Sequence, residues 1–361
     1  MKLLTQPGDG AAHLIKAINR AKSSVEIAIF RFNQREIETA LAHAVTRGVA
    51  VHALIAHTNR AGEENLRRLE LRLLAAGVTV ARTAGDLLRY HGKFMIVDRR
   101  ELYVLAFNLT YLDMEQSRSF GIITHNQKLV REAAKLFEAD SKRNSYEPTS
   151  DALVVSPANA RQRLAAFIQG ARKELFIYDP KISDPAMIRL LEERARAGVD
   201  VRIIGKVTRK SSPIAARKMQ PLRLHTRTMI RDGKLAFVGS QSLRAIELDM
   251  RREVGVIFRD AKSVSQMVKT FHDDWLATEQ NKEALVCTPV EKLAKKVAKV
   301  VARELPAVAP AVDSVVKKLT TETEGLELNA EEVAETVKDA VKEAVRIAVK
   351  DAVEEAVEQT R

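Results

Sequence analysis

Two histidines, each followed two residues later by a cation, are the residues of this chain best suited to chemistry. His91 precedes Lys93, and His225 precedes Arg227. An imidazole can attack phosphorus as a nucleophile or transfer a proton near neutral pH. A neighbouring cation can offset the negative charge that develops on phosphoryl oxygens without help from a metal. These pairs therefore indicate chemistry on a phosphodiester, with one histidine as the nucleophile and the other as the general acid.

Each histidine opens a longer motif. The first motif continues with Asp98 and Asn108, and the second with Asp232, Gly239, Ser240 and Ser242. Both aspartates fall between two short apolar stretches, where a β-hairpin is expected to turn, and Asp232-Gly233 is a typical tight-turn pair. We therefore expect Asp98, Asp232, Gly239, Ser240 and Ser242 to support the motifs structurally.

An internal repeat supplies the elements that must position these motifs. Residues 15–51 and 164–201 share an apolar stripe at helical spacing, an apolar strand, a second helix, and a glycine before a strand of alternating valines. Corresponding residues lie 150 positions apart here but 134 apart in the histidine motifs, so the second half lacks roughly the helix predicted at 65–74. A strand–helix–strand unit of this length predicts parallel strands joined by a crossover helix, with helices on both faces of a sheet.

The paired motifs resemble those of the phospholipase D superfamily, whose signature H-x-K-x4-D-x6-G-S-x-N occurs twice. The resemblance covers about residues 10–280. It implies an α/β fold of two similar α/β/α sandwich halves related by a pseudo-twofold axis, with the two histidines meeting at the seam. We place the first half at 1–145, the second at 146–288, and a helical low-complexity tail at 289–361.

The resemblance also implies a catalytic set. Its members are His91, Lys93, Asn108, His225, Arg227 and Glu253. We assign His91 as the nucleophile, because its motif keeps both Lys and Asn, and His225 as the general acid. The family often has a carboxylate eleven residues after the Asn position that orients the histidine. Glu253 occupies this position in the second half and Ser119 in the first, where Glu115 is a candidate substitute; because Glu253 would support His225, the reverse assignment stays open.

Both motifs depart from the family pattern. In the first, Leu105-Ala106 replaces Gly-Ser, and in the second Arg227 replaces Lys and Ser242 replaces Asn. An arginine keeps the charge and offers two parallel donors to phosphate oxygens, but its geometry differs from that of lysine. A non-catalytic phosphate-binding protein with a degenerate second motif is therefore one alternative function.

The charge of the chain favours an anionic partner. Of 361 residues, 59 are basic and 47 acidic, giving a net charge of +12; the segment 289–361 holds 12 basic and 15 acidic residues, which leaves +15 on residues 1–288. Aromatic residues make up only 5% of the chain, so few are available to stack on bases. We therefore expect a phospholipid more than a nucleic acid, with peripheral membrane contact through the basic body or the tail. A basic cluster before the second motif could hold headgroups; its members are Lys206, Arg209, Lys210, Arg217, Lys218 and Arg223.

The remaining features of the composition concern location and cofactors. The only cysteine, Cys287, cannot form an internal disulfide, and no apolar run is long enough to span a bilayer. We expect a cytoplasmic protein that needs no metal and no cofactor. The predicted function is cleavage or transfer of a phosphatidyl group in lipid metabolism through a phosphohistidine; the alternative enzyme is a metal-independent endonuclease of the same superfamily.

Overall fold

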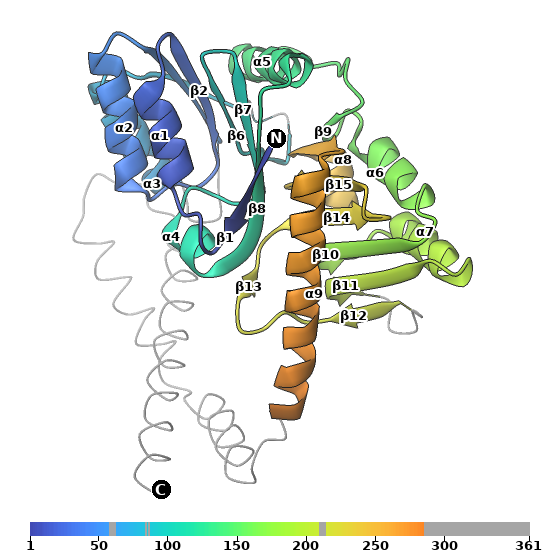
Figure 1. Ribbon diagram of the computed structural model, residues 1–361. Helices are drawn as coiled ribbons and strands as arrows, with labels where there is room; N and C mark the ends of the chain where they lie inside the picture. The colour runs from blue at the N-terminus through green and yellow to red at the C-terminus, as the bar shows by residue number, and fades with distance from the viewer. Residues whose placement is uncertain (58–62, 84, 86, 209–213, 285–361) are drawn as a thin grey trace, which may run out of the picture. The chain divides into compact units, whose positions relative to one another are not determined.

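A computed structural model describes residues 1–57, 63–83, 85, 87–208 and 214–284 of the chain (Figure 1). Residues Met1–Asn281 form one compact unit, which includes the predicted first half and residues 146–281 of the predicted second half. The predicted helical tail at 289–361, Cys287, and Arg209 and Lys210 of the basic cluster lie outside the described residues. Among the described residues, no helix is both long and apolar enough to cross a membrane.

The first half is built on a mixed sheet. In spatial order its strands are β1 (Lys2–Gln6), β8 (Ser117–Thr124), β7 (Glu101–Leu105), β6 (Phe94–Val97), β2 (Ser24–Ile29), β3 (Ala50–Ile55) and β4 (Thr79–Arg82). Strands β2, β3 and β4 are parallel, as the crossover pattern predicts, and the other pairs along this order are antiparallel. The helices of this half are α1 (Ala12–Arg20), α2 (Arg35–Thr46), α3 (Glu63–Ala75), α4 (Tyr111–Glu115) and α5 (Gln127–Lys142).

The second half repeats this plan. Its sheet has the order β12 (Ala215–Arg217), β11 (Asp200–Val207), β10 (Glu174–Ile182), β14 (Arg227–Arg231), β15 (Leu235–Gly239), β17 (Val254–Phe258) and β9 (Leu153–Val155). Its helices are α6 (Ala160–Gln169), α7 (Pro185–Arg196), α8 (Ala245–Asp249) and α9 (Ala261–Ala284). Among the described residues between β11 and β14 there is no counterpart of α3, in agreement with the shorter sequence. The predicted fold class, two similar α/β/α halves, is confirmed.

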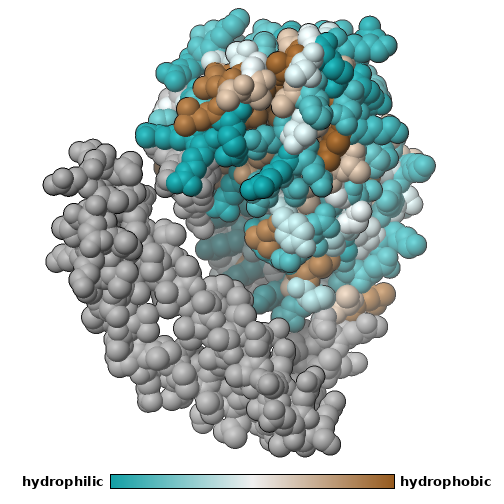
Figure 2. All heavy atoms as spheres, turned by 90° about the vertical axis from the view of Figure 1, so that its left-hand side faces the viewer, coloured by the Kyte–Doolittle hydropathy of each residue, from teal (hydrophilic) through white to brown (hydrophobic). Residues whose placement is uncertain are grey.

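Successive side chains of a strand point to opposite faces of the sheet, so each sheet contributes to two separate cores. In β2, Val25, Ile27 and Ile29 pack against the outer helices α1 and α2, whereas Ala28 belongs to a core shared by the two halves. The outer side of the first half, where α1 and α2 lie, is mainly hydrophilic (Figure 2). The second half has a matching core under α6 and α7.

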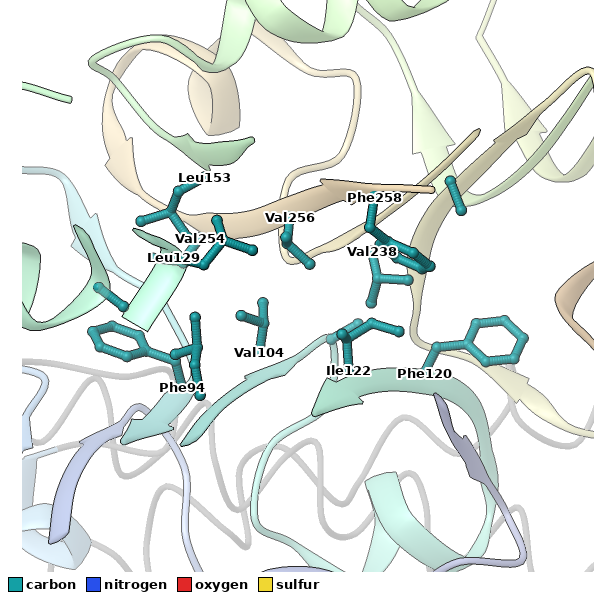
Figure 3. Packing of buried hydrophobic residues seen from close by; sticks show 14 of the residues in the cluster. Phe94, Val104, Phe120, Ile122, Leu129, Leu153, Val238, Val254, Val256 and Phe258 are labelled. Atoms are coloured by element: carbon teal, nitrogen blue, oxygen red, sulfur yellow. The ribbon is translucent and has the colours of Figure 1, made fainter. Parts of the chain in front are cut away.

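The shared core joins the two halves into one body. In it the first half contributes Phe94, Val104, Phe120, Ile122 and Leu129, and the second contributes Leu153, Val238, Val254, Val256 and Phe258 (Figure 3). Each of these side chains is at most 4% exposed. Helix α5 of the first half and its counterpart α9 also supply buried residues to this core. The sheets therefore face each other across a dry seam, and the two motif hairpins belong to this seam.

The hairpins β6–β7 and β14–β15 turn at the motif aspartates. Asp98 and Arg99 have φ of 51° and 49°, and Asp232 and Gly233 have φ of 52° and 59°. Each left-handed pair is the centre of a tight turn, closed by a hydrogen bond from the backbone N–H of Arg100 to the Val97 carbonyl or from that of Lys234 to the Arg231 carbonyl. The Asp98 carboxylate accepts hydrogen bonds from the backbone N–H groups of residues 22–24, and that of Asp232 accepts from residues 172–174. Partial burial opposes ionisation, but these N–H groups lower the pKa of both carboxyls. Both side chains thus fasten a hairpin to the loop before β2 or β10.

Candidate active site

A two-residue strand precedes each histidine and pairs with a strand of the opposite half. β5 (Arg89–Tyr90) pairs with β16 (Arg251–Arg252), and β13 (Arg223–Leu224) pairs with β8. The backbone N–H of His91 donates to the Arg252 carbonyl at 2.7 Å, and that of His225 donates to the Arg118 carbonyl at 3.2 Å. Each histidine is therefore anchored on the half to which it does not belong in sequence.

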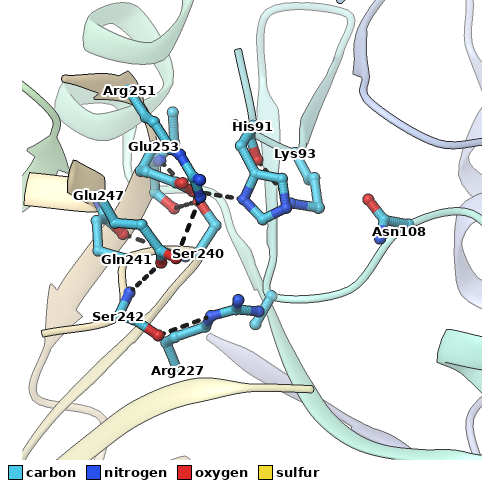
Figure 4. Close-up of polar contacts among 12 residues, drawn as sticks. His91, Lys93, Asn108, Arg227, Ser240, Gln241, Ser242, Glu247, Arg251 and Glu253 are labelled. Carbon is cyan, nitrogen blue, oxygen red and sulfur yellow. Dashed lines mark hydrogen bonds and ion pairs between the residues drawn. The ribbon is translucent and has the colours of Figure 1, made fainter. Parts of the chain in front are cut away.

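His91 is held by a carboxylate from the second half. Its Nδ1 lies 2.7 Å from Oε2 of Glu253, which is fully buried (Figure 4). The ring edge also packs on Phe30, with the ring centroids 4.6 Å apart. The expectation that Glu253 orients His225 is therefore wrong. The parallel pairing of β5 with β16 brings Glu253, which follows β16, beside His91, which follows β5.

His225 has a different set of partners. Its Nδ1 lies 3.0 Å from the carbonyl oxygen of Ala106, which can only accept, so Nδ1 carries a hydrogen. Its Nε2 lies 3.4 Å from Oδ2 of Asp113. Ser119, at the position where the family often has a carboxylate, is buried with no hydrogen-bond partner for its hydroxyl. Glu115, which the sequence suggested as a substitute orienter of His91, is exposed and lies toward Gly10, and Glu253 holds His91 instead.

The two motif cations make equivalent contacts. Lys93 Nζ donates to the carbonyl of His91 at 2.6 Å, and Arg227 Nη1 donates to the carbonyl of His225 at 2.7 Å. Burial lowers the pKa of Lys93 to about 7, and the charge of Arg227 adds to this shift. Burial also lowers the pKa of both imidazoles well below the usual range, and both sense the charges of Lys93 and Arg227. A bound anion would therefore favour the protonated forms of Lys93 and the imidazoles.

Carboxylates position the last polar residue of each motif. Asn108 donates from its backbone N and from Nδ2 to Oδ2 of Asp113, at 2.9 and 2.6 Å. In the second half, the backbone N of Ser242 donates to Glu247 at 2.9 Å and its hydroxyl donates to Asp179 at 2.7 Å. The Oδ1 atom of Asn108 is buried with no hydrogen-bond partner. Asn108 is thus fixed with one polar atom still available to a ligand.

Gly239 and Ser240 pack the strand that leads to Ser242. A Cβ at Gly239 would lie 2.8 Å from the Cα of Gly255 on the neighbouring strand, so only glycine allows this approach. The Ser240 hydroxyl accepts a hydrogen bond from the backbone N of Val254 at 3.1 Å. These contacts are structural, and they hold the segment that leads into Glu253.

Several charged residues of the site were not among those predicted from the sequence. Asp113 and Glu247 lie five residues after Asn108 and Ser242 and keep the 134-residue offset of the motifs, which is the signal that could have revealed them. Arg223, considered only as part of a basic cluster, donates to Asp113 Oδ1 at 2.6 Å. Arg217 of the same cluster instead lies over the ring of Trp275, 3.9 Å from its centroid.

Among the described residues, no group of three or more His, Cys, Asp or Glu side chains is arranged to hold a metal ion. Two imidazoles and two cations, one of each from either half of a duplicated α/β/α fold, define a phospholipase D-type site. A family model described as the phospholipase D-like domain of cardiolipin synthase matches residues 14–141 and 164–275. The chain therefore belongs to this family, and the resemblance noted from the motifs is confirmed.

Similar proteins include enzymes of lipid and phosphate chemistry. A mitochondrial cardiolipin hydrolase from Danio rerio is 29% identical over 137 residues, which are 37% of this chain and 59% of that protein. The phosphatidylserine synthase of Haemophilus influenzae Rd KW20 has a similar fold, with a TM-score of 0.59 at 12% identity over 84% of this chain and 94% of that one. The polyphosphate kinase of Porphyromonas gingivalis has a TM-score of 0.63 at 18% identity over 75% of this chain and 49% of that one. At these identities the two structures share the fold with this chain.

Proposed function

We propose that this protein cleaves or transfers the phosphatidyl group of a phospholipid through a phosphohistidine on His91. The observation that carries the proposal is the asymmetry of the two imidazoles. Glu253 binds Nδ1 of His91, which leaves Nε2 as the nitrogen with a lone pair. His225 instead bears a hydrogen on Nδ1 and has a carboxylate near Nε2. Because Glu253 contacts His91 and not His225, it supports His91 as the nucleophile.

The proposed reaction has two displacements at phosphorus. Nε2 of His91 attacks, the bond from phosphorus to the leaving oxygen breaks, and that oxygen takes the proton from Nε2 of His225. His225 then removes a proton from water or an acceptor alcohol, whose oxygen attacks phosphorus. The phosphorus–nitrogen bond breaks, and its electron pair returns to His91. Glu253 stabilises the charged imidazole in between by accepting the Nδ1 hydrogen.

The two motif cations fit the non-bridging phosphoryl oxygens, which are hydrogen-bond acceptors. Lys93 and Arg227 are each held by a backbone carbonyl and bring positive charge to the same cluster. A phosphate monoanion would favour the protonated form of Lys93, whose pKa is lowered to about 7 by burial. These groups are fixed before substrate binds, so they stabilise transition-state charge without reorganisation.

Substitution of the two histidines tests the mechanism. His91→Ala should abolish both turnover and the covalent phosphoenzyme, which acid quenching of a 32P-labelled substrate would trap. His225→Ala should retain substantial turnover of a 4-nitrophenyl phosphodiester, because that leaving group needs no proton. Phosphoenzyme in His91→Ala but not in His225→Ala would reverse the assignment, and wild-type rates in both variants would place the site elsewhere.

A substrate comparison tests the rest of the proposal. Purified protein should release or transfer the headgroup of labelled cardiolipin or phosphatidylglycerol in vesicles, and should do so in excess EDTA. A hydrolysis product or a transfer product identifies the acceptor. Cleavage of single- or double-stranded DNA with no action on lipid would support the endonuclease alternative. Loss of activity in EDTA that magnesium restores would contradict a metal-independent mechanism.

We also propose that the face around the site contacts a phospholipid surface. Four apolar side chains in segments next to the site are 44–58% exposed, and these are Leu88, Tyr111, Leu112 and Met250. The backbone N of Leu88 donates to the carbonyl of Met250, so these two belong to one edge. Basic side chains of the same segments would add attraction to anionic lipids.

Vesicle sedimentation tests this contact. Replacing both Tyr111 and Leu112 with Ser should weaken binding to vesicles containing anionic lipid several-fold. The matched control replaces Leu71 and Leu74 on α3, which are 66% and 49% exposed, and should bind like the wild type. Equal binding by both double variants would contradict the proposed face.

A further inference from the structure

Asp113 is a buried carboxylate of the site that the phospholipase D signature does not include. It lies on α4 in the first half, is 2% exposed, and faces His225 of the second half. We propose that Asp113 is a positioning residue that orients His225 and favours its protonated form, the general acid, because Ser119 supplies no carboxylate at the position where the family often has one. This inference rests on the proposed phosphodiesterase function.

The contacts of Asp113 fix its carboxylate. Oδ1 accepts from Arg223 Nη1 at 2.6 Å, and Oδ2 accepts from the backbone N and Nδ2 of Asn108. Oδ2 then lies 3.4 Å from Nε2 of His225, while Nδ1 of the same ring donates to Ala106. Both ring nitrogens therefore have partners in the first half, which defines the plane of the imidazole.

The charges around His225 give Asp113 a specific electrostatic role. The imidazole is faced by Asp113 from α4, Arg223 from β13, Arg227 from β14 and Lys93 from the segment before β6. Burial lowers the pKa of His225, Asp113 raises it, and the three cations lower it further. Although burial opposes it, the pKa of Asp113 itself is lowered by His225, by the hydrogen bond from Asn108 and by Arg223, so it remains a carboxylate. Asp113 thus partly offsets the effect of three cations, which disfavour the protonated imidazole that must supply a proton to the leaving group.

The matching residue of the second half acts on its histidine through charge alone: Glu247 raises the pKa of His91 but does not contact the imidazole as an ion pair. Glu247 lies at the same 134-residue offset from Asp113, yet its Oε1 accepts from Arg244 and Arg251, and its Oε2 accepts from the backbone N of Ser242. None of the ion pairs among the described residues joins Glu247 to His91. The two histidines therefore differ in the carboxylate that contacts them, which is Glu253 at Nδ1 of His91 and Asp113 near Nε2 of His225.

Asp113→Asn tests this role, because the amide oxygen can still accept from Asn108 while the charge is lost. We expect kcat/KM for an alkyl phosphodiester to fall about 10- to 100-fold, and that for a 4-nitrophenyl phosphodiester to change less than about 3-fold. The pH above which turnover falls should move down by about one unit more for the alkyl diester than for the 4-nitrophenyl diester. Asp113 raises the pKa of both His225 and Lys93, but Lys93 serves both substrates whereas the proton of His225 is needed only by the alkyl leaving group. Asp113→Ser allows the same comparison if the asparagine variant does not fold, since it adds no bulk. The matched control, Glu247→Gln, should change the rates of both diesters by the same factor.

The outcomes separate this inference from the proposed function. Equal losses on both diesters by both Asp113 variants, with no difference between the shifts of the two pH profiles, would show that Asp113 does not act through the proton of His225, and would overturn the inference while the wild type still forms phosphoenzyme. A wild type that neither forms phosphoenzyme nor cleaves either diester would overturn the proposed function instead.

Discussion

Two chemically identical imidazoles differ here through the single atom that each ring nitrogen contacts. Glu253 Oε2 lies 2.7 Å from Nδ1 of His91, whereas His225 has a carbonyl oxygen on Nδ1 and a carboxylate near Nε2. Burial raises the pKa of Glu253 to about 7. The nucleophile is therefore supported by a carboxylate that itself titrates near neutral pH.

At the residue scale, we predict that protonation of Glu253 causes the fall of kcat/KM on the acid side, or acid limb, of the pH profile. Because its pKa is raised, Glu253 takes up a proton as the pH falls through about 7 and then no longer accepts the Nδ1 hydrogen of His91. For the wild type, kcat/KM should fall below about pH 7. Glu253→Gln should lower kcat/KM about 10- to 100-fold at pH 7.5 on alkyl and 4-nitrophenyl diesters alike, and the residual activity should lack this limb. An unchanged acid limb in Glu253→Gln would assign it to another group.

At the scale of elements, two-residue strands decide the site. β5 and β13 are too short to contribute much stability, yet each pairs with the opposite half and delivers a histidine there. Behind them, the hairpins β6–β7 and β14–β15 are tied to their sheets by Asp98 and Asp232. The site therefore depends on turns that never touch the substrate.

This arrangement predicts that the turn aspartates affect stability and not chemistry. Asp98→Asn retains a residue that tolerates positive φ but loses the charge that binds three N–H groups, and should cost about 1 kcal/mol. The same change at Asp232 should have a similar effect, while kcat per folded molecule stays at the wild-type value. Because the folded-state pKa of Asp98 is depressed, its contribution is present above about pH 4 and is lost as the pH falls through the folded value. Urea unfolding at pH 7 and pH 3 should show the difference from the wild type shrinking in acid, and an equal difference at both pH values would contradict a charge effect.

At the scale of the whole molecule, the shared core makes the halves interdependent. Phe94, Phe120 and Val256 are buried against residues of the other half, so either half alone would expose this surface. The site is divided in the same way, because Glu253 serves His91 and Asp113 serves His225.

We therefore predict that residues 1–145 and 146–284 are each inactive when produced alone and become active when produced together. Even if the first half paired with itself, Ser119 would stand where Glu253 is needed. Co-purification followed by phosphoenzyme trapping measures the outcome. Phosphoenzyme formed by either half alone would contradict a site divided between the halves.

The sequence by itself determined the duplicated α/β/α fold, the hairpins and the motif residues. Helical and strand periodicity and the repeated spacing around His91 and His225 are properties of the linear chain, so they can be recognised without knowing which residues are in contact. The loss of the α3 counterpart was visible in the same way, as a change in offset from 150 to 134.

Only the tertiary structure decided which carboxylate serves which histidine. Along the chain Glu253 is 28 residues from His225 and 162 from His91, so sequence proximity favoured the wrong pair. Parallel pairing of β5 with β16 and of β13 with β8 exchanges the partners across the seam. Asp113 was missed for the same reason, because a carboxylate on a short helix gains its role only where the opposite half folds against it.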